Sequence, residues 1–511
     1  MALARIDEGR GRVLGWAAVI LTGLAASMLA WNHQVGGWGV ETDFYSVYLP
    51  QAREIMDGWP LVRGVVHNPP GFAGLVGALG LVVGNEFTAA VIWSVIGTMG
   101  LVWATAQIGQ AAFGPFVGAF AAALVGCTLL PFSYLAATDA LGAFLIVLPL
   151  ALLARWPAPT NRGVFGLGLL IGLAYLVRSN AVVVLPVIAL GLLTVVPVGR
   201  AIRRRAITVL WLGLGVITTV VPWLVVNATA TGSGTGSTAH LQIAAHFFGG
   251  SSGDAYAVTT FPLMAAKFHS LADVLRYDPV ALVARYIQDV VLAIPLQLLL
   301  DGARFPGLLL VGIGLLGGTT KSRAIALGYW AVFVLGALLL ALVGYVPRYY
   351  LFAFPGIAFL MAIGARRLIL STEDTRLGTF AAAGLIGFSA LSLLVFSLRD
   401  ATRQVREEPK HLLALADSIR SITRPGDIVF GRKPHLAVLA GRAWAFAPVS
   451  TADSLVQSAR LRGARLMIYS DFEANLWPAL KPLKDPSLAP NGLVLRFRDA
   501  ATNTNVYELT P

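Results

Sequence analysis

The chain has 511 residues, of which 57% are hydrophobic and only 13% are charged. Its mean hydropathy of +0.73 excludes an ordinary soluble globular protein, because such proteins are near half apolar and lack long unbroken apolar runs. The formal net charge is +12, but many of the basic residues lie in short loops between apolar runs, which is typical of a membrane protein and disfavours nucleic-acid binding.

The first apolar run covers residues 13–31 and follows Arg5, Arg10 and Arg12. Basic residues before an apolar run are typical of a signal peptide, but this run is long for one and SMLAWNH is a poor cleavage site. We therefore expect an uncleaved first span with its N-terminus in the cytoplasm.

An acidic stretch, ETDFYSVYLPQAREIMDG, follows this span at residues 41–58. Its apolar residues recur at helical spacing, which predicts a short helix lying along the membrane surface. Asp43 falls at the start of that helix, where an acid can cap the helix or serve a function. Glu54 and Asp57 are expected to face solvent.

Basic loops at residues 155–162, 200–205, 321–323 and 366–376 predict the cytoplasmic face. Working outward from them places Asp139 outside, which requires that the short run at 69–84 does not cross the membrane. The expected fold is a polytopic α-helical membrane protein with eleven spans. The spans are expected near residues 13–31, 87–108, 112–133, 139–155, 163–178, 180–197, 207–227, 304–318, 323–343, 348–365 and 377–398.

Two outer segments complete this organisation: a first outer loop at 32–86 and a long outer loop at 228–303. The long loop contains TGSGTGSTAH, which lacks the preceding strand and following Lys of a nucleotide loop and is expected to be a mobile outer loop. His240 and His246 lie on the segment after this loop, HLQIAAHFF, which is a predicted surface helix; a two-histidine metal site is one possibility for them and a substrate contact of His246 is another. QDVVLAIPLQLLLDGARF is expected to be a surface helix leading into the span at 304–318.

The tail at residues 399–511 differs in composition from the rest of the chain. HLLALADSIRSI has helical periodicity, and DIVFG, ARLMIYS and LVLRFRD have the composition of strands. We expect a small extracytoplasmic α/β domain here, following a transmembrane module at residues 1–398. Cys127, the one cysteine, lies in an apolar run and is expected to be a core residue, so no disulfide or cysteine metal site can form within the chain.

Charged residues gather at the predicted outer level: Asp139, Arg178 and Arg348 at span ends, and Arg63 and His67 in the first outer loop. Each has an ordinary alternative, because an acid can cap a helix and an arginine at a span end can extend to the interface. Together they predict an outward-facing anion site, since guanidinium groups donate paired hydrogen bonds to phosphate.

Five stretches, in this order, resemble the GT-C glycosyltransferases of the protein mannosyltransferase and aminoarabinose transferase type. They are TDFYSVYLPQAREIMDGWPL, HNPPGFAGLVGAL, TDALGAFLIVLPLALL, LAYLVRSNAVVVLPV and PRYYLFAFPGIAFLMAIG. The resemblance runs from the first span to about residue 367 and covers the tail less specifically. It implies transfer of a sugar, with inversion, from a polyprenyl-phosphate carrier to an acceptor outside the cytoplasm.

The resemblance also implies roles for residues of this chain. Asp43 would be the general base, and Asp139 would orient the acceptor or hold a divalent ion together with Asp43. The implied phosphate ligands are Arg348 and Arg178, followed by His67 and Arg63, and the candidate substrate contacts are Tyr45, Tyr349 and His246.

The expected partners are a polyprenyl-phosphate-linked sugar, the lipid bilayer, and a glycan, lipid or protein acceptor. The resemblance requires no cofactor, and a divalent metal remains open. High usage of Gly, Ala, Arg and Val favours a bacterial plasma membrane as the location. Two alternatives remain: a transporter or flippase of a lipid-linked or anionic solute, and a membrane scaffold whose tail binds a partner.

Overall fold

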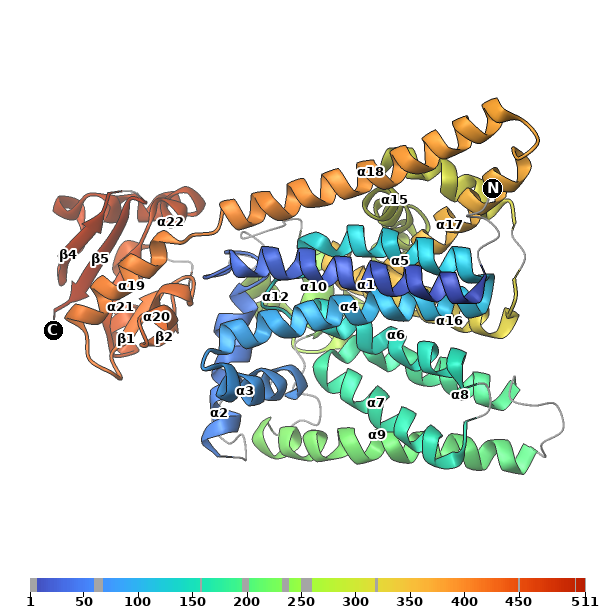
Figure 1. The fold of residues 1–511 in the computed structure, drawn as a ribbon. Helices are drawn as coiled ribbons and strands as arrows, with labels where there is room; N and C mark the ends of the chain where they lie inside the picture. The colour runs from blue at the N-terminus through green and yellow to red at the C-terminus, as the bar shows by residue number, and fades with distance from the viewer. Residues whose placement is uncertain are drawn as a thin grey trace. The chain divides into compact units, whose positions relative to one another are not determined.

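The computed structural model describes residues 7–58, 68–156, 159–194, 202–231, 239–249, 260–317, 320–448, 451–500 and 502–510. The chain forms two compact units (Figure 1). The first unit consists of Met1–His33, Tyr48–Thr238 and Pro279–Arg406, and the second of Gln34–Val47, Ala239–Asp278 and Glu407–Pro511. The division into a transmembrane module at 1–398 and an extracytoplasmic domain at 399–511 stays a prediction.

The first unit is helical in its described residues. Its longer helices are α1 (Glu8–Trp31), α4 (Glu86–Phe113), α5 (Pro115–Leu129), α6 (Asp139–Arg155), α7 (Asn161–Val177), α9 (Ile202–Thr231), α15 (Ile294–Leu315), α16 (Arg323–Leu340), α17 (Phe354–Ser371) and α18 (Arg376–Arg406). Shorter helical segments are α2 (Leu49–Asp57), α3 (Gly71–Val83), η3 (Leu130–Phe132), η4 (Ser179–Val183), α8 (Val184–Thr194), α14 (Pro279–Gln288), η6 (Asp289–Ala293), η7 (Ala341–Val343) and η8 (Pro347–Ala353). The π-helical turn η2 (Phe44–Tyr48) precedes α2.

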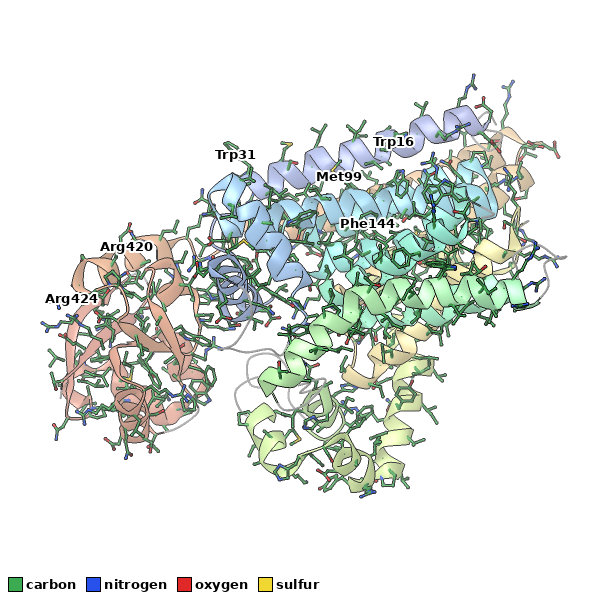
Figure 2. The ribbon with its side chains drawn as sticks, turned by 90° about the horizontal axis from the view of Figure 1, so that it is seen from below. Trp16, Trp31, Met99, Phe144, Arg420 and Arg424 are labelled. Atoms are coloured by element: carbon green, nitrogen blue, oxygen red, sulfur yellow. The ribbon has the colours of Figure 1, made fainter. Side chains whose placement is uncertain are left out.

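Eight helical stretches in the described residues are long and apolar enough to cross a membrane. Their outer faces are apolar: on α1, Trp16 and Trp31 are 53% and 85% exposed, and both belong to the row of side chains along that helix in Figure 2. Helices with apolar side chains on every face are typical of membrane spans. The number of crossings remains a prediction. At 13 residues, α3 is about 20 Å long, shorter than the hydrocarbon layer, which agrees with the expectation that it does not cross.

Close helix packing in the first unit depends on small residues. A Cβ atom on Gly97 of α4 would lie 2.4 Å from the backbone nitrogen of Leu141 in α6, so only glycine permits this approach. One turn earlier in α4, the Ser94 hydroxyl donates to the carbonyl oxygens of Leu135 and Ala137, at 2.5 and 3.1 Å. Helix α4 therefore fixes both the start of α6 and the irregular turn before it.

Helix α15 is two helices joined at a kink, where Arg304 has a φ of 54° and a ψ of 171°. This agrees with the predicted change from a surface helix to a span near residue 304. Beside the kink, the Tyr345 hydroxyl donates to Asp301 at 2.7 Å, and the Tyr345 ring stacks on Tyr350 at 5.1 Å. These contacts hold the segment between α16 and α17 that carries Arg348.

The second unit contains a five-stranded sheet in the order β2-β1-β3-β5-β4. Its strands are β1 (Ile428–Gly431), β2 (Ala443–Phe446), β3 (Ala464–Tyr469), β4 (Leu493–Asp499) and β5 (Thr504–Leu509). Strands β1, β2 and β3 are parallel, whereas β5 runs antiparallel to both β3 and β4. The predicted strands correspond to β1, β3 and β4, and the predicted helix is α19 (His411–Ile422); β2 and β5 were not foreseen.

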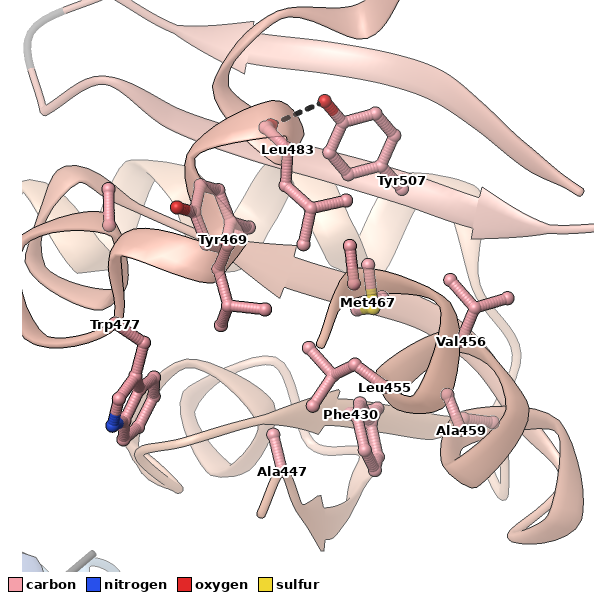
Figure 3. Packing of buried hydrophobic residues seen from close by; sticks show 14 residues of the cluster. Phe430, Ala447, Leu455, Val456, Ala459, Met467, Tyr469, Trp477, Leu483 and Tyr507 are labelled. Carbon is pink, nitrogen blue, oxygen red and sulfur yellow. Dashed lines mark hydrogen bonds between the residues drawn. The ribbon is translucent and has the colours of Figure 1, made fainter. Parts of the chain in front are cut away.

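Helices cover both faces of this sheet. On one face, α21 (Ala452–Leu461) packs Leu455 and Val456 against a core that contains Phe430 and Met467 (Figure 3). On the other, α19 and α20 (His435–Leu439) pack on a second core that contains Val429. Neighbouring residues Val429 and Phe430 point to opposite faces, as alternation along a strand requires. The remaining helical segments of this unit are α10 (Ala239–Phe248), α12 (Phe261–Lys267), α13 (Leu271–Tyr277), α22 (Asp471–Leu476), η9 (Pro478–Lys484) and η10 (Pro486–Leu488).

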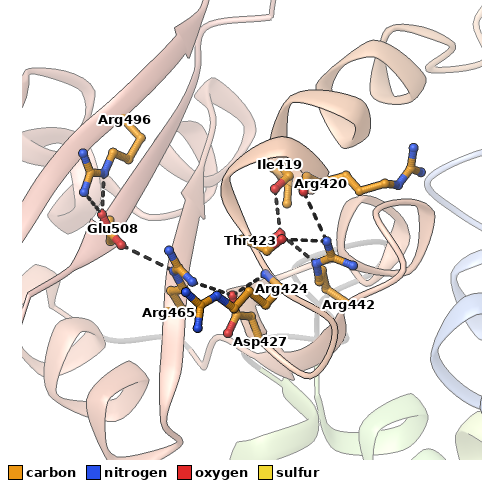
Figure 4. A network of polar contacts seen from close by, with 9 residues as sticks. All are labelled: Ile419, Arg420, Thr423, Arg424, Asp427, Arg442, Arg465, Arg496 and Glu508. Carbon is orange, nitrogen blue, oxygen red and sulfur yellow. Dashed lines mark hydrogen bonds and ion pairs between the residues drawn. The ribbon is translucent and has the colours of Figure 1, made fainter.

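A polar network connects the end of α19 with strands β3, β4 and β5 and with the residues directly before β1 and β2 (Figure 4). Arg465 of β3 pairs with Asp427 at 2.9 Å and with Glu508 of β5 at 3.4 Å, and Arg496 of β4 also pairs with Glu508. Arg442 donates to the Thr423 hydroxyl at 2.7 Å. Ion pairs near a surface contribute little to stability each, so the two cores account for most of the domain's stability.

Candidate active site

Asp139 lies in the first turn of α6 and is buried, with 6% of its side chain exposed. It does not cap the helix, because Thr138 occupies the N-cap position and no side-chain capping bond is formed there. The Asp139 carboxylate instead accepts a hydrogen bond from Arg178 Nη1 at 2.5 Å. The functional interpretation of this acid is therefore favoured over the capping one.

Arg178 follows the last residue of α7 and has an extended backbone that separates α7 from η4. The same Nη1 atom also donates to the Thr138 hydroxyl at 3.0 Å, and the side chain is 15% exposed. Its path passes Gly142, where a Cβ atom would lie 2.7 Å from Arg178 Cδ. The absence of a side chain at Gly142, one turn after Asp139, leaves the space that this arginine occupies.

Arg348 approaches the same carboxylate from η8, with Nη1 3.7 Å from Asp139 Oδ2 and 17% of its side chain exposed. The Tyr349 ring lies beside both arginines, because the Arg178 and Arg348 guanidinium carbons are each 5.0 Å from its centroid. A ring face near guanidinium groups attracts their positive charge and restricts their motion. Four residues singled out in the sequence therefore meet at one place: Asp139, Arg178, Arg348 and Tyr349.

The formal charge of this cluster is positive, since it combines two guanidinium groups with one carboxylate. The Asp139 carboxylate lies closer to Arg178 than to Arg348: its oxygens are 2.5 Å from Arg178 Nη1 and 3.7 Å from Arg348 Nη1. Guanidinium groups held in a site that is mostly closed to water are well suited to bind a phosphate through paired hydrogen bonds. The cluster can therefore hold an anion while Asp139 keeps the arginines in place.

Asp43 belongs to the second unit, where it is exposed and directly precedes η2. The helical segment after it agrees with the prediction, and Glu54 and Asp57 on α2 are exposed as expected. Glu41 is buried, with 1% exposure, and accepts a hydrogen bond from the Gly37 backbone N–H at 2.6 Å. Asp43 is thus an accessible carboxylate next to a well-ordered turn.

The other predicted contacts differ in their surroundings. Tyr45 is 2% exposed and its hydroxyl donates to the Val35 carbonyl at 2.6 Å, so it stabilises its own segment and we do not retain it as a substrate contact. His246 lies on α10, half-buried, with its ring 4.9 Å from that of Phe247. Arg63, His67 and most of the TGSGTGSTAH loop lie outside the described residues.

Within the described residues, no group of three or more His, Cys, Asp or Glu side chains is arranged to hold a metal ion. Several residues around the cluster were not foreseen: Ser94, Thr138 and Gly142 act through packing and local hydrogen bonds, which leave no recognisable pattern in one sequence.

The second unit contains a cavity of about 200 Å³ at the carboxyl ends of β1 and β3. Here the chain leaves β1 toward β2 on one side and returns to β3 on the other, and ligands in open α/β sheets favour such a position. Trp38 lies on the wall of this cavity, as do Lys433 and Glu473. Trp38 comes from the segment that carries Asp43.

No family model and no curated protein matches the chain. Among solved structures, it is similar to ArnT from Cupriavidus metallidurans bound to undecaprenyl phosphate, with 14% identity, a TM-score of 0.55 and coverage of 97% of each chain. It is also similar to the oligosaccharyltransferase AglB from Archaeoglobus fulgidus in complex with an inhibitory peptide and a dolichol-phosphate, with 11% identity, a TM-score of 0.56 and coverage of 97% of this chain and 74% of that one.

Both neighbours are GT-C glycosyltransferases, and identities this low show a shared fold alone. Together with the apolar helices, this likeness makes the chain a multi-pass membrane protein. Its fold is that of the GT-C glycosyltransferases.

Proposed function

We propose that the chain is a membrane glycosyltransferase that moves a sugar from a polyprenyl-phosphate carrier to an acceptor outside the cytoplasm, with inversion. The observation that carries this proposal is the cluster of Asp139, Arg178 and Arg348 in a chain with the GT-C fold. ArnT, with the same fold, was solved with undecaprenyl phosphate and AglB with a dolichol-phosphate. A lipid phosphate is thus the anion that best fits two arginines in a membrane protein.

The proposed reaction forms a bond between an acceptor oxygen and the anomeric carbon of the sugar. The bond from that carbon to the carrier phosphate breaks, and its electron pair leaves with the polyprenyl phosphate. Asp43 accepts the proton of the acceptor hydroxyl, a step that requires hydrogen-bond reach. Arg178 and Arg348 stabilise the charge that develops on the leaving phosphate, because fixed donors act strongly where water is excluded.

Asp139 has a positioning role in this scheme: its carboxylate holds Arg178 and neutralises part of the charge of the pair when no phosphate is bound. The acceptor class remains open. The cavity beside Trp38 offers hydrogen-bonding side chains on the unit that carries Asp43. We propose that the acceptor contacts this cavity.

Lipid mass spectrometry tests the proposal. Membranes are compared from cells with the intact gene, without it, and with Asp43→Asn, with Asp57→Asn on the exposed face of α2 as a matched control. We expect a polyprenyl-phosphate sugar to accumulate without the gene and with Asp43→Asn, because removing a general base slows a reaction about 10²- to 10⁴-fold. The mass of the accumulated lipid identifies the class of sugar.

Asp57→Asn should behave as wild type. If the amount of carrier-linked sugar is the same in all strains and Asp43→Asn behaves as wild type, the glycosyltransferase function is refuted. That result would favour a transporter or flippase of a lipid-linked or anionic solute.

A further inference from the structure

The segment Gln34–Val47 follows the first long helix in the sequence but belongs to the same compact unit as the tail, Glu407–Pro511. Val35 has no exposed surface and lies in the hydrophobic core that also contains Leu412, Leu415 and Val429 of the tail. A residue buried in a domain core is part of that domain's fold. The segment that carries Asp43 is therefore an integral part of the tail domain.

Glu408 is the polar anchor of this segment. Its Oε1 atom accepts hydrogen bonds from three consecutive backbone N–H groups, at 2.7 Å from Gln34, 2.8 Å from Gly36, and from Val35 between them. Successive backbone N–H groups that converge in this way form an anion-binding nest. Because the Glu408 side chain is only 1% exposed, these charge-assisted bonds are shielded from water.

The backbone of the nest requires glycine. Gly36 has a φ of +82°, a conformation that side chains with a Cβ atom rarely adopt, and a Cβ there would also lie 3.0 Å from the Glu41 carboxylate. The chain then turns so that Glu41 accepts from Gly37 N–H at 2.6 Å. Two buried carboxylates thus fix consecutive parts of the same turn.

Two tail residues hold the part of the segment nearest Asp43. Lys433 Nζ donates to the Trp38 carbonyl at 2.6 Å and to the Thr42 hydroxyl at 3.1 Å. His435 Nε2 lies 3.2 Å from the Gly37 carbonyl, and its ring lies 4.9 Å from that of Trp38. Thr42 is the residue directly before Asp43, so the contacts of the tail extend to the side chain one residue before the exposed carboxylate.

We propose that the tail domain positions Asp43 for transfer and that Glu408 is the principal positioning residue, which rests on the function proposed above. A base that accepts a proton must be held within hydrogen-bond reach, and a displacement of about 1 Å can slow a reaction about 10²-fold. Glu408 touches no reacting atom in this scheme. It acts through the backbone of residues 34–36, which leads into the turn that presents Asp43.

The first test measures the position of the segment without reference to activity. Hydrogen exchange followed by mass spectrometry is carried out on the full chain in nanodiscs, comparing wild type, Glu408→Ala, Glu408→Gln and the control Glu407→Ala, whose side chain is exposed. Loss of the acceptor should speed exchange of the amides of residues 34–36 about 10- to 100-fold in Glu408→Ala. Glu408→Gln should show a smaller increase, since its amide oxygen still accepts hydrogen bonds.

Peptides from β3 and β5 should keep their protection in all variants, which shows that the domain remains folded. Unchanged exchange of residues 34–36 in Glu408→Ala would overturn the proposal.

The second test measures turnover per folded molecule, using the accumulated carrier-linked sugar of the gene-deficient membranes as donor. We expect kcat to fall about 10²-fold in Glu408→Ala with the donor KM unchanged, and Glu408→Gln to recover part of that loss. Faster exchange at residues 34–36 with normal kcat would reject the positioning role. Full activity of Asp43→Asn would instead refute Asp43 as the base of the proposed reaction. The exchange rates of residues 34–36 do not depend on that outcome, so the two failures can be distinguished.

Discussion

Two buried carboxylates, Asp139 in the first unit and Glu408 in the second, are each compensated by hydrogen-bond donors, but the type of donor differs. In the first unit, Asp139 faces the guanidinium groups of Arg178 and Arg348, at 2.5 and 3.7 Å. In the second, Glu408 faces backbone N–H groups of residues 34–36. Both acids avoid the cost of an uncompensated buried charge.

The difference between them concerns what the donors can do next. Guanidinium groups end long side chains and carry full charges, so they can turn toward an incoming phosphate and retain Asp139 as a partner. Backbone N–H groups of a nest are fixed by the chain and have no other acceptor to reach. The donor type therefore separates a carboxylate that can participate in ligand binding from one that only organises the fold.

Substituting Asp139 by Asn should produce the largest effect among tests of this comparison. The change leaves two mostly buried guanidinium groups without their counter-charge, and breaking such an arrangement costs about 3–5 kcal/mol. We expect a clear fall in the thermal midpoint of the first unit in detergent and loss of carrier turnover. Millimolar phosphate should restore part of the midpoint, because an added anion can replace the carboxylate. A midpoint equal to that of wild type would show that the arginines do not depend on Asp139.

The second unit should lose stability as the pH falls, because His435 is buried in its neutral form. Burial is the main reason that the pKa of His435 is lowered to about 4; the charges of Lys433 and Arg432 act in the same direction, and the Gly37 carbonyl and Glu41 oppose them. The folded state then resists protonation while the unfolded state accepts it, so this contribution is fully present above about pH 6.5 and is lost as the pH approaches 4. The loss is on the order of 3 kcal/mol.

Chemical denaturation of the full chain at several pH values, followed by the fluorescence of tryptophans in the tail unit, checks this expectation. In His435→Gln the slope of stability against pH between 6.5 and 5 should be smaller than in wild type. Equal slopes would assign the pH dependence to other groups.

A smaller effect is expected at Gly142. An alanine there places its Cβ 2.7 Å from Arg178 Cδ and 3.1 Å from Arg178 Cβ, so the arginine must shift away from Asp139. Overpacking of this kind costs about 1–3 kcal/mol. We expect a lower thermal midpoint and a raised donor KM for Gly142→Ala.

Gly166→Ala on α7 provides the matched control, since nothing lies within 4 Å of a Cβ at that position. It should be neutral or stabilising by up to about 1 kcal/mol, because alanine favours the helix. A Gly142→Ala variant that behaved like this control would show that Arg178 has room to adjust.

The sequence predicted the elements whose pattern is local. Helix α19 and strands β1, β3 and β4 agree with their apolar periodicity, and the kink in α15 lies at the residue where the sequence predicted that a surface helix leads into a span. Strand β5 was missed because it contains polar residues that only the fold satisfies: Asn505 is 1% exposed and its amide donates to the carbonyls of Leu483 and Lys484. Strand β2 has four residues, Ala-Trp-Ala-Phe, and is too short for its two aromatic residues to establish a period.

The same distinction applies to the candidate site. Asp139, Arg178 and Arg348 could be selected because charged residues at the ends of apolar spans are unusual, and the structure brings them together. Glu408 could not be selected, since it is one acid in a charged run, where its ion pair with Lys410 at 3.8 Å is unremarkable, and its hydrogen-bond donors are backbone groups that leave no trace in the sequence. Tyr45 was selected as an aromatic near Asp43, but its hydroxyl donates to the Val35 carbonyl within the same segment.

The anchoring of residues 34–36 by Glu408 also has a consequence for biosynthesis. The two partners are separated by as many as 374 positions along the chain. At a synthesis rate of about 5–20 residues per second, Glu408 is made roughly 20–75 s after Gln34. Throughout that interval the segment with Asp43 lacks its anchor, so a truncated or stalled chain presents its helices to the membrane while the turn before Asp43 is not yet fixed.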